Sequence, residues 1–201
     1  MAKAVRICCF GGDHRGGRGS ARHGGPARTR HARQLIFSPR LRKGVLAAHL
    51  TFSVGWIGAV LSYLGLGITA VRSSNVSTVR SAWIGMEIIG WFVIVPLATT
   101  SVLTGLLISL GTRWGLFRHY WVLISFALSL FSAVILILHM PTVSALAEAA
   151  QTAEGAALRA LGGDLAHPSI GLAILLCVQV LNIYKPRGLT RYGWRRQQEA
   201  G

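Results

Sequence analysis

Five ionisable side chains lie in or beside long apolar runs of this 201-residue chain. They are His49, Glu87, His119, His139 and His167. Imidazole and carboxylate groups are the usual protein ligands of zinc, copper and iron. Because it costs free energy to place such groups in a membrane, ionisable residues inside a membrane-spanning helix are candidates for function.

The elements that must position these side chains are four apolar runs: 45–71, 84–110, 120–140 and 168–184. A helix needs about 20 apolar residues to cross the hydrocarbon core of a bilayer. Backbone groups in lipid must bond within their own segment, and these runs are longer than the strands of a membrane barrel. The predicted fold is therefore all-α, an integral membrane bundle of four transmembrane helices.

The distribution of charge predicts the orientation of this bundle. The chain has 21 Lys and Arg against 6 Asp and Glu, and 52% of its residues are hydrophobic, which excludes an ordinary soluble domain. Residues 1–44, 111–119 and 185–201 hold 18 of the 21 basic residues. Since basic residues concentrate in cytoplasmic segments, both termini are predicted to be cytoplasmic, with the bundle in the cell membrane.

Three regions of the chain are predicted on this basis. Residues 1–42 form a disordered basic tail, since they are rich in Gly and Arg and poor in apolar residues; an alternative is that the translation start is misassigned. Residues 43–185 form the transmembrane domain. In this domain, residues 141–167 are an outer loop with a helix that continues the third span or lies beside it. Residues 186–201 form a second basic tail.

Basic residues next to the spans are predicted to contact the anionic head groups of the bilayer. They are Arg40, Arg42, Lys43, Lys185, Arg187, Arg191, Arg195 and Arg196. An Arg- and Gly-rich tail can also bind nucleic acid. However, only Phe10 and Phe37 are able to stack on bases there, so no nucleic-acid partner is expected.

A transmembrane haem b held by two histidines is one hypothesis for the imidazoles, with His49, His119 and His139 as candidates. His119 and His139 are separated by about 30 Å along a helix, so they cannot ligate one haem together. His49 shares the inner half of the bundle with His119. The leading interpretation has no cofactor, and these histidines then bond to neighbouring helices or head groups.

A second hypothesis is a transition-metal site at the outer side, formed by Glu87, His139 and His167. These residues come from three different spans but lie at a similar predicted depth. Glu87 has two alternative roles, as a hydrogen-bonding partner near the interface or as part of a proton or ion relay.

Two further patterns concern packing. Ser125, Ser132 and His139 recur every seven residues and should share one helix face, and Pro96 is predicted to kink the second helix.

Long stretches of the chain resemble a family of small four-helix membrane proteins of actinobacteria whose function is unknown. The resemblance covers residues 45–196, and the strings that carry it are VGWIGAV, MEIIGWFVIVPLATTSVLTGLLISLGTRWGLFRHYWVL, ILHM and YKPRGLTRYGWRRQ. It implies the architecture and a cell-membrane location but no established activity. Many family members have Lys where this chain has Ser125, which weakens any mechanism that needs a charge in the middle of the third span. The motif positions most worth testing are His49, Trp114, Arg118, His119 and His139.

The leading functional prediction is a non-enzymatic membrane subunit or partner-binding module. It would associate with copies of itself or with another membrane protein. The connections between spans are too short to hold a catalytic domain, and no nucleophile–base motif is present. The alternatives are a membrane redox component that binds haem or a metal, and a small proton- or ion-linked transporter subunit.

Overall fold

The computed structural model describes residues 38–111, 116–186 and 188–198, all within one compact unit, Gln34–Gly201. Its elements are α1 (Pro39–Arg72), α2 (Val76–Ile89), the π-helix η1 (Gly90–Ile94), α3 (Val95–Gly111), α4 (Tyr120–Thr152), α5 (Gly155–Ala160), α6 (Ala166–Tyr184) and α7 (Arg191–Gln198). Four helical stretches are long and apolar enough to cross a membrane. The prediction of an all-α chain with four such helices is confirmed, and residues 1–37 of the predicted tail lie outside the described residues.

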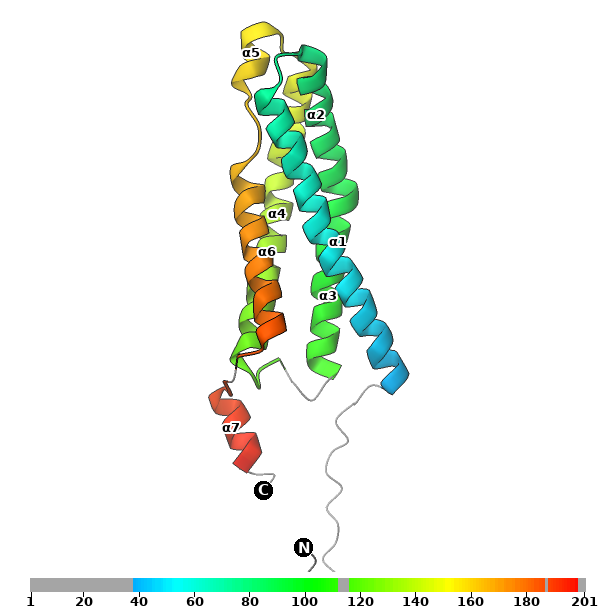
Figure 1. Ribbon diagram of the computed structural model, residues 1–201, viewed down its shortest axis with the longest axis vertical. Helices are drawn as coiled ribbons and strands as arrows, with labels where there is room; N and C mark the ends of the chain where they lie inside the picture. Colours follow the sequence, from blue (N-terminus) through cyan, green and yellow to red (C-terminus); the bar gives the residue numbers. More distant parts are fainter. Residues whose placement is uncertain (1–37, 112–115, 187, 199–201) are drawn as a thin grey trace, which may run out of the picture. The chain divides into compact units, whose positions relative to one another are not determined.

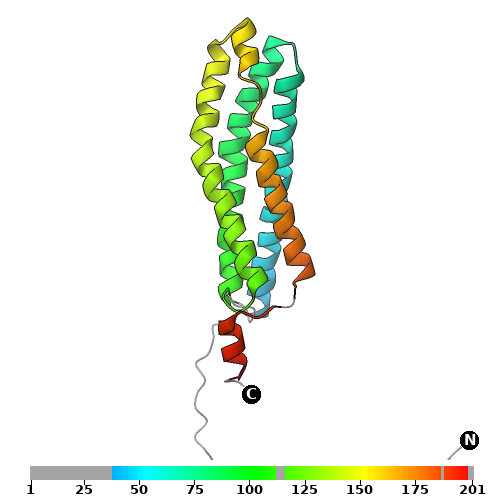
Figure 2. The same cartoon turned by 90° about the vertical axis from the view of Figure 1, so that its left-hand side faces the viewer.

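The four long stretches run alternately up and down as neighbours (Figure 1, Figure 2). Helix α1 packs against α2, α3 and α6, and α4 packs against α2, α3 and α6. We call the end that carries α5 the α5 end. The opposite end, where α1 and α4 begin and α3 and α6 finish, is the α7 end (Figure 1).

Three of the helices begin earlier than the apolar runs predicted, α6 by two residues, α1 by six and α2 by eight. Helix α1 begins at Pro39, and the Ser38 hydroxyl accepts a hydrogen bond from the backbone of the first turn. Residues 39–42 are therefore helical and do not belong to a disordered tail. Helix α2 begins at Val76, eight residues before the predicted span, because the Asn75 side chain caps it by accepting from the backbone N–H groups of Ser77 and Thr78.

The predicted outer loop 141–167 is largely helical. Helix α4 continues through Pro141 to Thr152, so the helix there extends the third span and does not lie beside it. Its last carbonyls are satisfied by Arg80 of α2, whose guanidinium donates to the backbone oxygens of Ala150 and Ala153, both at 3.0 Å. Helix α5 and a short irregular segment then lead into α6, which begins at Ala166.

The irregularity predicted at Pro96 takes the form of the π-helix η1 just before it. Proline has no N–H to donate to the carbonyl four residues back. Each hydrogen-bonded turn of a π-helix contains one residue more than a turn of an α-helix. Here the N–H of Val95 bonds to the carbonyl of Gly90, five residues back. Helices α2 and α3 therefore continue as one stretch with a π-turn in the middle.

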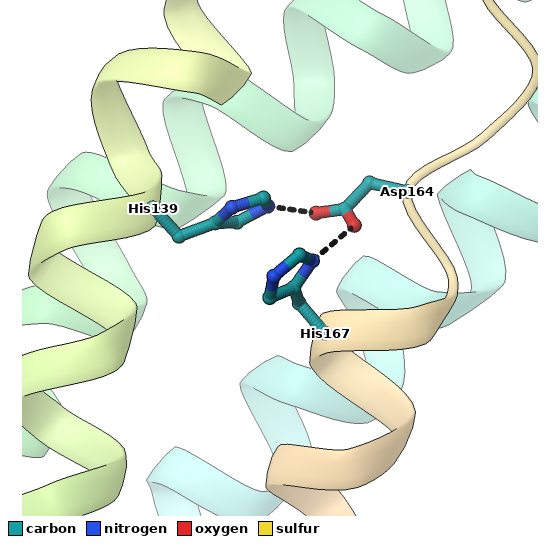
Figure 3. A group of neighbouring side chains, drawn as sticks. All are labelled: His139, Asp164 and His167. Atoms are coloured by element: carbon teal, nitrogen blue, oxygen red, sulfur yellow. Dashed lines mark hydrogen bonds and ion pairs between the residues drawn. The ribbon is translucent and has the colours of Figure 1, made fainter.

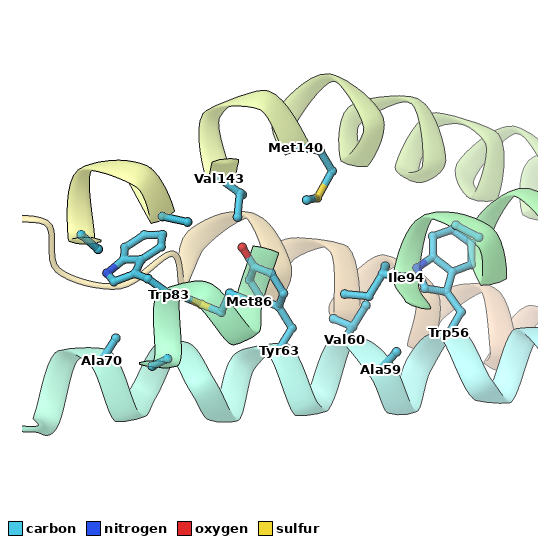
Figure 4. Close-up of a cluster of buried hydrophobic side chains, with 14 of the residues drawn as sticks. Trp56, Ala59, Val60, Tyr63, Ala70, Trp83, Met86, Ile94, Met140 and Val143 are labelled. Carbon is cyan, nitrogen blue, oxygen red and sulfur yellow. The ribbon is translucent and has the colours of Figure 1, made fainter. Parts of the chain in front are cut away.

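The largest fully buried side chains of the described residues lie toward the α5 end, and Figure 4 shows several of them. The side chains of Trp83, Met86 and Val143 are fully buried there. Small residues such as Ala147 and Ala150 are fully buried between the helices, and α2 and α4 are in direct contact. Complete burial of each large side chain contributes roughly 1.5–3 kcal/mol, so this end holds the bundle together.

The character of the exposed surface changes along the helices at the level of Pro141. Before Pro141, the exposed side chains of α4 are apolar. The large ones are Tyr120, Ile124, Leu130, Phe131, Val134, Ile135, Ile137 and Leu138. After Pro141 they include Thr142, Glu148, Gln151 and Thr152. Helix α2 shows the same change, from exposed Ser77 and Ser81 at the α5 end to exposed Ile88. On α2 and α4 the apolar belt therefore ends below the α5 end, whereas α1 still exposes Ile68 and Val71 near its last turn.

The segment before α6 lies directly on the backbone of α1. A Cβ atom on Gly163 would lie 2.5 Å from the carbonyl oxygen of Gly67, and one on Gly67 would lie 3.1 Å from the carbonyl oxygen of Asp164. Only glycine fits at position 163, and a side chain at position 67 would be tight against the segment before α6. This contact fixes the position of Asp164 relative to α1.

We expect G163A to lower the free energy of unfolding by roughly 1–3 kcal/mol, because the new methyl group would clash with backbone that cannot move away. Thermal unfolding of the purified chain in mild detergent measures this change. The control is G171A in α6, where a Cβ meets nothing within 4 Å. Equal melting temperatures for the two variants would contradict the predicted contact.

Candidate metal centre

Three side chains that can ligate a metal converge where α6 begins (Figure 3). Helix α4 supplies His139, the segment before α6 supplies Asp164, and the first turn of α6 supplies His167. His139 Nε2 lies 2.8 Å from Asp164 Oδ2, and His167 Nδ1 lies 3.6 Å from Asp164 Oδ1. The group joins two helices through one carboxylate.

A fourth side chain, Tyr63 of α1, orients this carboxylate. Its hydroxyl donates a hydrogen bond of 2.9 Å to Asp164 Oδ2. The Asp164 side chain is only 8% exposed, so its charge depends on these partners for stabilisation. Because an ionised carboxylate only accepts hydrogen bonds, His139 carries a hydrogen on Nε2 in this arrangement.

The two imidazole rings stack on each other, with centroids 3.8 Å apart and planes inclined by 22°. Rings in van der Waals contact leave no room for a planar macrocycle between them. Binding of one ion by both rings requires one of them to turn, because the in-plane lone pairs of stacked rings do not converge. His167 has the space to turn, since its side chain is 55% exposed against 17% for His139.

The spacing of the group fits a small transition-metal ion. One ligand atom from each of the three residues lies within 4.8 Å of the others. In a tetrahedral zinc site, metal–ligand distances near 2.0–2.1 Å place the ligand atoms about 3.3 Å apart. The separations near this value, 2.8 Å from His139 and 3.6 Å from His167, run to the two different oxygens of Asp164, so one ring must move before all three residues bind one ion. Three protein ligands leave a fourth position for water, and Tyr63 would support the carboxylate from outside the coordination sphere.

A cavity of about 260 Å³ lies on the inner side of this group. His139, Asp164, His167 and Tyr63 lie along its wall. The rest of the wall is mostly apolar: Trp56, Val60, Ile94, Phe131, Ile135, Leu136, Met140, Pro168, Ile170, Ile174 and Leu175. The polar group therefore closes one side of an otherwise apolar space.

The structure brings together two of the three residues predicted as metal ligands. His139 and His167 meet, whereas Glu87 is half buried on α2 and is not part of the group. Asp164 provides the carboxylate instead. The sequence analysis treated position 164 only as part of the outer loop 141–167. Its place three residues before His167, at the start of an apolar span, is a signal that could have identified Asp164.

The histidines considered for haem lie in three separate settings. His49 Nδ1 lies 3.1 Å from both the Ser101 carbonyl oxygen and the Thr104 hydroxyl, so it bonds to α3. His119 precedes α4 and forms an isolated backbone bridge with Leu189. His139 belongs to the group with Asp164. The stacked rings of His139 and His167 leave no space for a haem between them, whereas His49 and His119 take part in other contacts.

The seven-residue spacing on α4 does place its residues toward the interior. Ser125 and Ser132 are both buried, and His139 is half buried on the same face. No hydrogen bond satisfies the hydroxyl of either serine among the described residues. These groups therefore lie beside interior space without a polar partner from the protein.

The basic residues predicted to contact lipid lie at the α7 end. Arg40, Arg42 and Lys43 are exposed in the first turns of α1. Lys185, Arg191 and Arg195 are exposed after α6 and on α7, whereas Arg187 and the side chain of Arg196 lie outside the described residues. Thr190 ties α7 to the segment before α4, because its hydroxyl donates to the carbonyl of Phe117 and its N–H donates to that of Arg118.

Comparison of the chain with protein-family models, with curated proteins and with solved structures finds no match. The resemblance to the actinobacterial four-helix family therefore stays a prediction. The arguments for function come from the geometry of this chain.

We expect D164A to lower the free energy of unfolding by roughly 1–3 kcal/mol in the presence of EDTA, because Tyr63 and His139 would lose a shared buried partner. Thermal unfolding of D164A, Y63F and the double variant measures both the loss and the coupling of the pair. We expect a coupling of about 1 kcal/mol. The matched control E148A removes an exposed acid of the same region and should change little; strictly additive effects of Y63F and D164A would argue against the hydrogen bond.

Proposed function

We propose that this chain is a multi-pass membrane protein whose apolar belt lies in lipid and whose α5 end stands outside it. The change from apolar to polar exposed side chains at Pro141 supports this boundary. Helix α6, with 19 residues, is about 28 Å long, which is close to the hydrocarbon thickness of a bilayer. The site around Asp164 would then lie at the membrane–water interface.

The proposed orientation has the α7 end in the cytoplasm and both termini on that side, in the cell membrane. The exposed basic residues of the α7 end support it, because basic residues are retained on the cytoplasmic side. The acidic residues Glu148, Glu154 and Asp164 all lie toward the α5 end.

Single cysteines tested with a membrane-impermeant thiol reagent check this topology, in a background where Cys8, Cys9 and Cys177 are replaced by serine. We expect labelling of intact cells at Ser74 and Glu154, which are exposed at the α5 end. Labelling at Arg195 is expected only after the cells are opened. Labelling of Arg195 and protection of Glu154 in intact cells would reverse the proposed orientation.

We further propose that the protein binds one divalent transition-metal ion through His139, Asp164 and His167. The single observation that carries this proposal is the convergence of three ligand atoms within 4.8 Å. The ion would join α4 to the start of α6, as the present hydrogen bonds do more weakly. The chain is then a non-enzymatic membrane module in which the metal holds the α5 end in shape for a partner.

Zinc titration of the metal-free protein in detergent tests this proposal. We expect one Zn²⁺ per chain by elemental analysis and a higher melting temperature, equivalent to about 2.7 kcal/mol at a free concentration of 100 times Kd. Binding should weaken as the pH falls, because protons compete for the imidazoles.

The informative variant is H167A, because the half-exposed His167 can be removed without loss of the Tyr63–Asp164–His139 hydrogen bonds. We expect H167A to lose the zinc and E87Q and H49A to keep it. Zinc retained at full stoichiometry in H167A, or absent from the native chain, would refute the site.

A further inference from the structure

A second cavity, of about 370 Å³, lies at the α7 end between α1, α3, α4 and α6. Trp56 and Leu175 line this cavity and also the cavity beside the metal site. They therefore form the layer that separates the two spaces. The cavity at the α7 end extends from this layer to Arg42 at the start of α1 and Lys185 after α6.

The wall of this cavity carries polar side chains, one of which has no hydrogen-bond partner among the described residues. Ser125 is only 6% exposed, and its hydroxyl has no hydrogen-bond partner among the described residues. Gln179 and Asn182 lie one turn apart on α6, line the cavity and are half buried. An unsatisfied buried polar group costs about 1–3 kcal/mol, so a polar ligand or water must complete this wall.

The charged side chains among the described residues that line this cavity are all basic. Arg42 and Lys185 lie at its α7 end, and none of the described residues that line the cavity is acidic. A partner with a negative charge at this end and hydrogen-bonding groups next to it would complement the lining.

The cavity opens on the side of the bundle. Leu50 of α1 and Ile183 of α6 both line it and are both exposed on the apolar belt. Apolar side chains make up most of the remaining wall, including Trp56, Ile57, Val102, Val122, Phe126, Leu175 and Val178. A ligand that enters here comes from the surface that would face lipid, and a long apolar part of it can remain outside.

We propose that this cavity binds one anionic phospholipid of the adjacent leaflet. Its phosphate lies at Arg42 and Lys185, and its ester or head-group oxygens accept hydrogen bonds from Gln179 and Asn182. One acyl chain follows the apolar wall toward Trp56. The inference rests on the proposed membrane insertion of the chain and not on the metal site.

Native mass spectrometry of the full chain, purified from membranes in a neutral detergent, tests this inference with phosphatidylglycerol as the probe. We expect one bound phosphatidylglycerol per chain and roughly tenfold weaker binding in R42Q, which loses one charge-assisted contact. The matched control is R40Q, which removes the same charge from an exposed residue of the same helix turn that does not line the cavity. Equal loss in R40Q and R42Q would reduce the effect to general attraction at the surface and overturn the proposal.

A second variant, N182L, separates lipid binding from folding. Leucine removes the carboxamide but adds no unsatisfied polar group, so the melting temperature in lipid-free detergent should not fall. Phosphatidylglycerol should then stabilise the native chain and not N182L. Equal stabilisation of the native chain by phosphatidylcholine, or by inorganic phosphate alone, would overturn the assignment of an anionic lipid.

Fractionation of the cells that produce the chain, before purification, keeps the two proposals apart. A chain absent from the membrane fraction would overturn membrane insertion and this inference together. A chain found in membranes that binds no phosphatidylglycerol would overturn only the lipid site.

Discussion

The burial of the Asp164 carboxylate is the constraint on which the arrangement of α6 depends. A charge that is 92% removed from solvent is tolerated only where hydrogen bonds replace its water. Tyr63 of α1 and His139 of α4 supply those bonds from two sides. The contact of Gly163 with the backbone of Gly67 brings Asp164 within their reach. Since α6 begins two residues later, its position against both helices follows from these contacts.

The unequal lengths of the helices explain why the two ends of the bundle differ. Helices α1 and α4 have 34 and 33 residues, about 50 Å each, whereas α6 has 19. The excess length forms the α5 end, where exposed polar residues surround a core built on Trp83 and Met86. Apolar burial drives packing in water but gives little preference for helix–helix contact in lipid. The large, fully buried side chains at the α5 end and the cavity of about 370 Å³ at the α7 end fit the proposed placement of these ends outside and inside the lipid.

The sequence predicted the four long helices but neither their full lengths nor α7. A run of about 20 apolar residues is a strong and local signal, so all four helices were found. The extension of α2 was missed because Ser77 and Arg80 are compatible with a helix whose polar face meets water, whereas the continuation of α4 past Pro141 was one of two predicted alternatives. How far a helix extends beyond its apolar run depends on its packing against other helices. The sequence of one helix does not reveal these packing partners.

The candidate site shows the same division between local and non-local information. Depth along the helices was enough to predict that His139 and His167 lie at the same level. The choice between Glu87 and Asp164 depends on which carboxylate the fold brings into contact, and that contact requires Gly163 to pack on Gly67, nearly a hundred residues earlier in the chain. No spacing rule within the sequence encodes such a contact.

The two cavities give little support to the alternative of an ion-linked transporter. Trp56, which is almost fully buried, and Leu175 lie between them. The cavity beside the metal site is lined mainly by apolar side chains, so an ion that moved inward from Asp164 would lose its ligands and its water together. Glu87, the carboxylate predicted for a relay, lines neither cavity. The geometry therefore favours a metal ion that stays bound near the start of α6 over one that passes through the bundle. Helix α6 is the element that both proposed ligands share, because the metal would bind at its first turn and the lipid at its last.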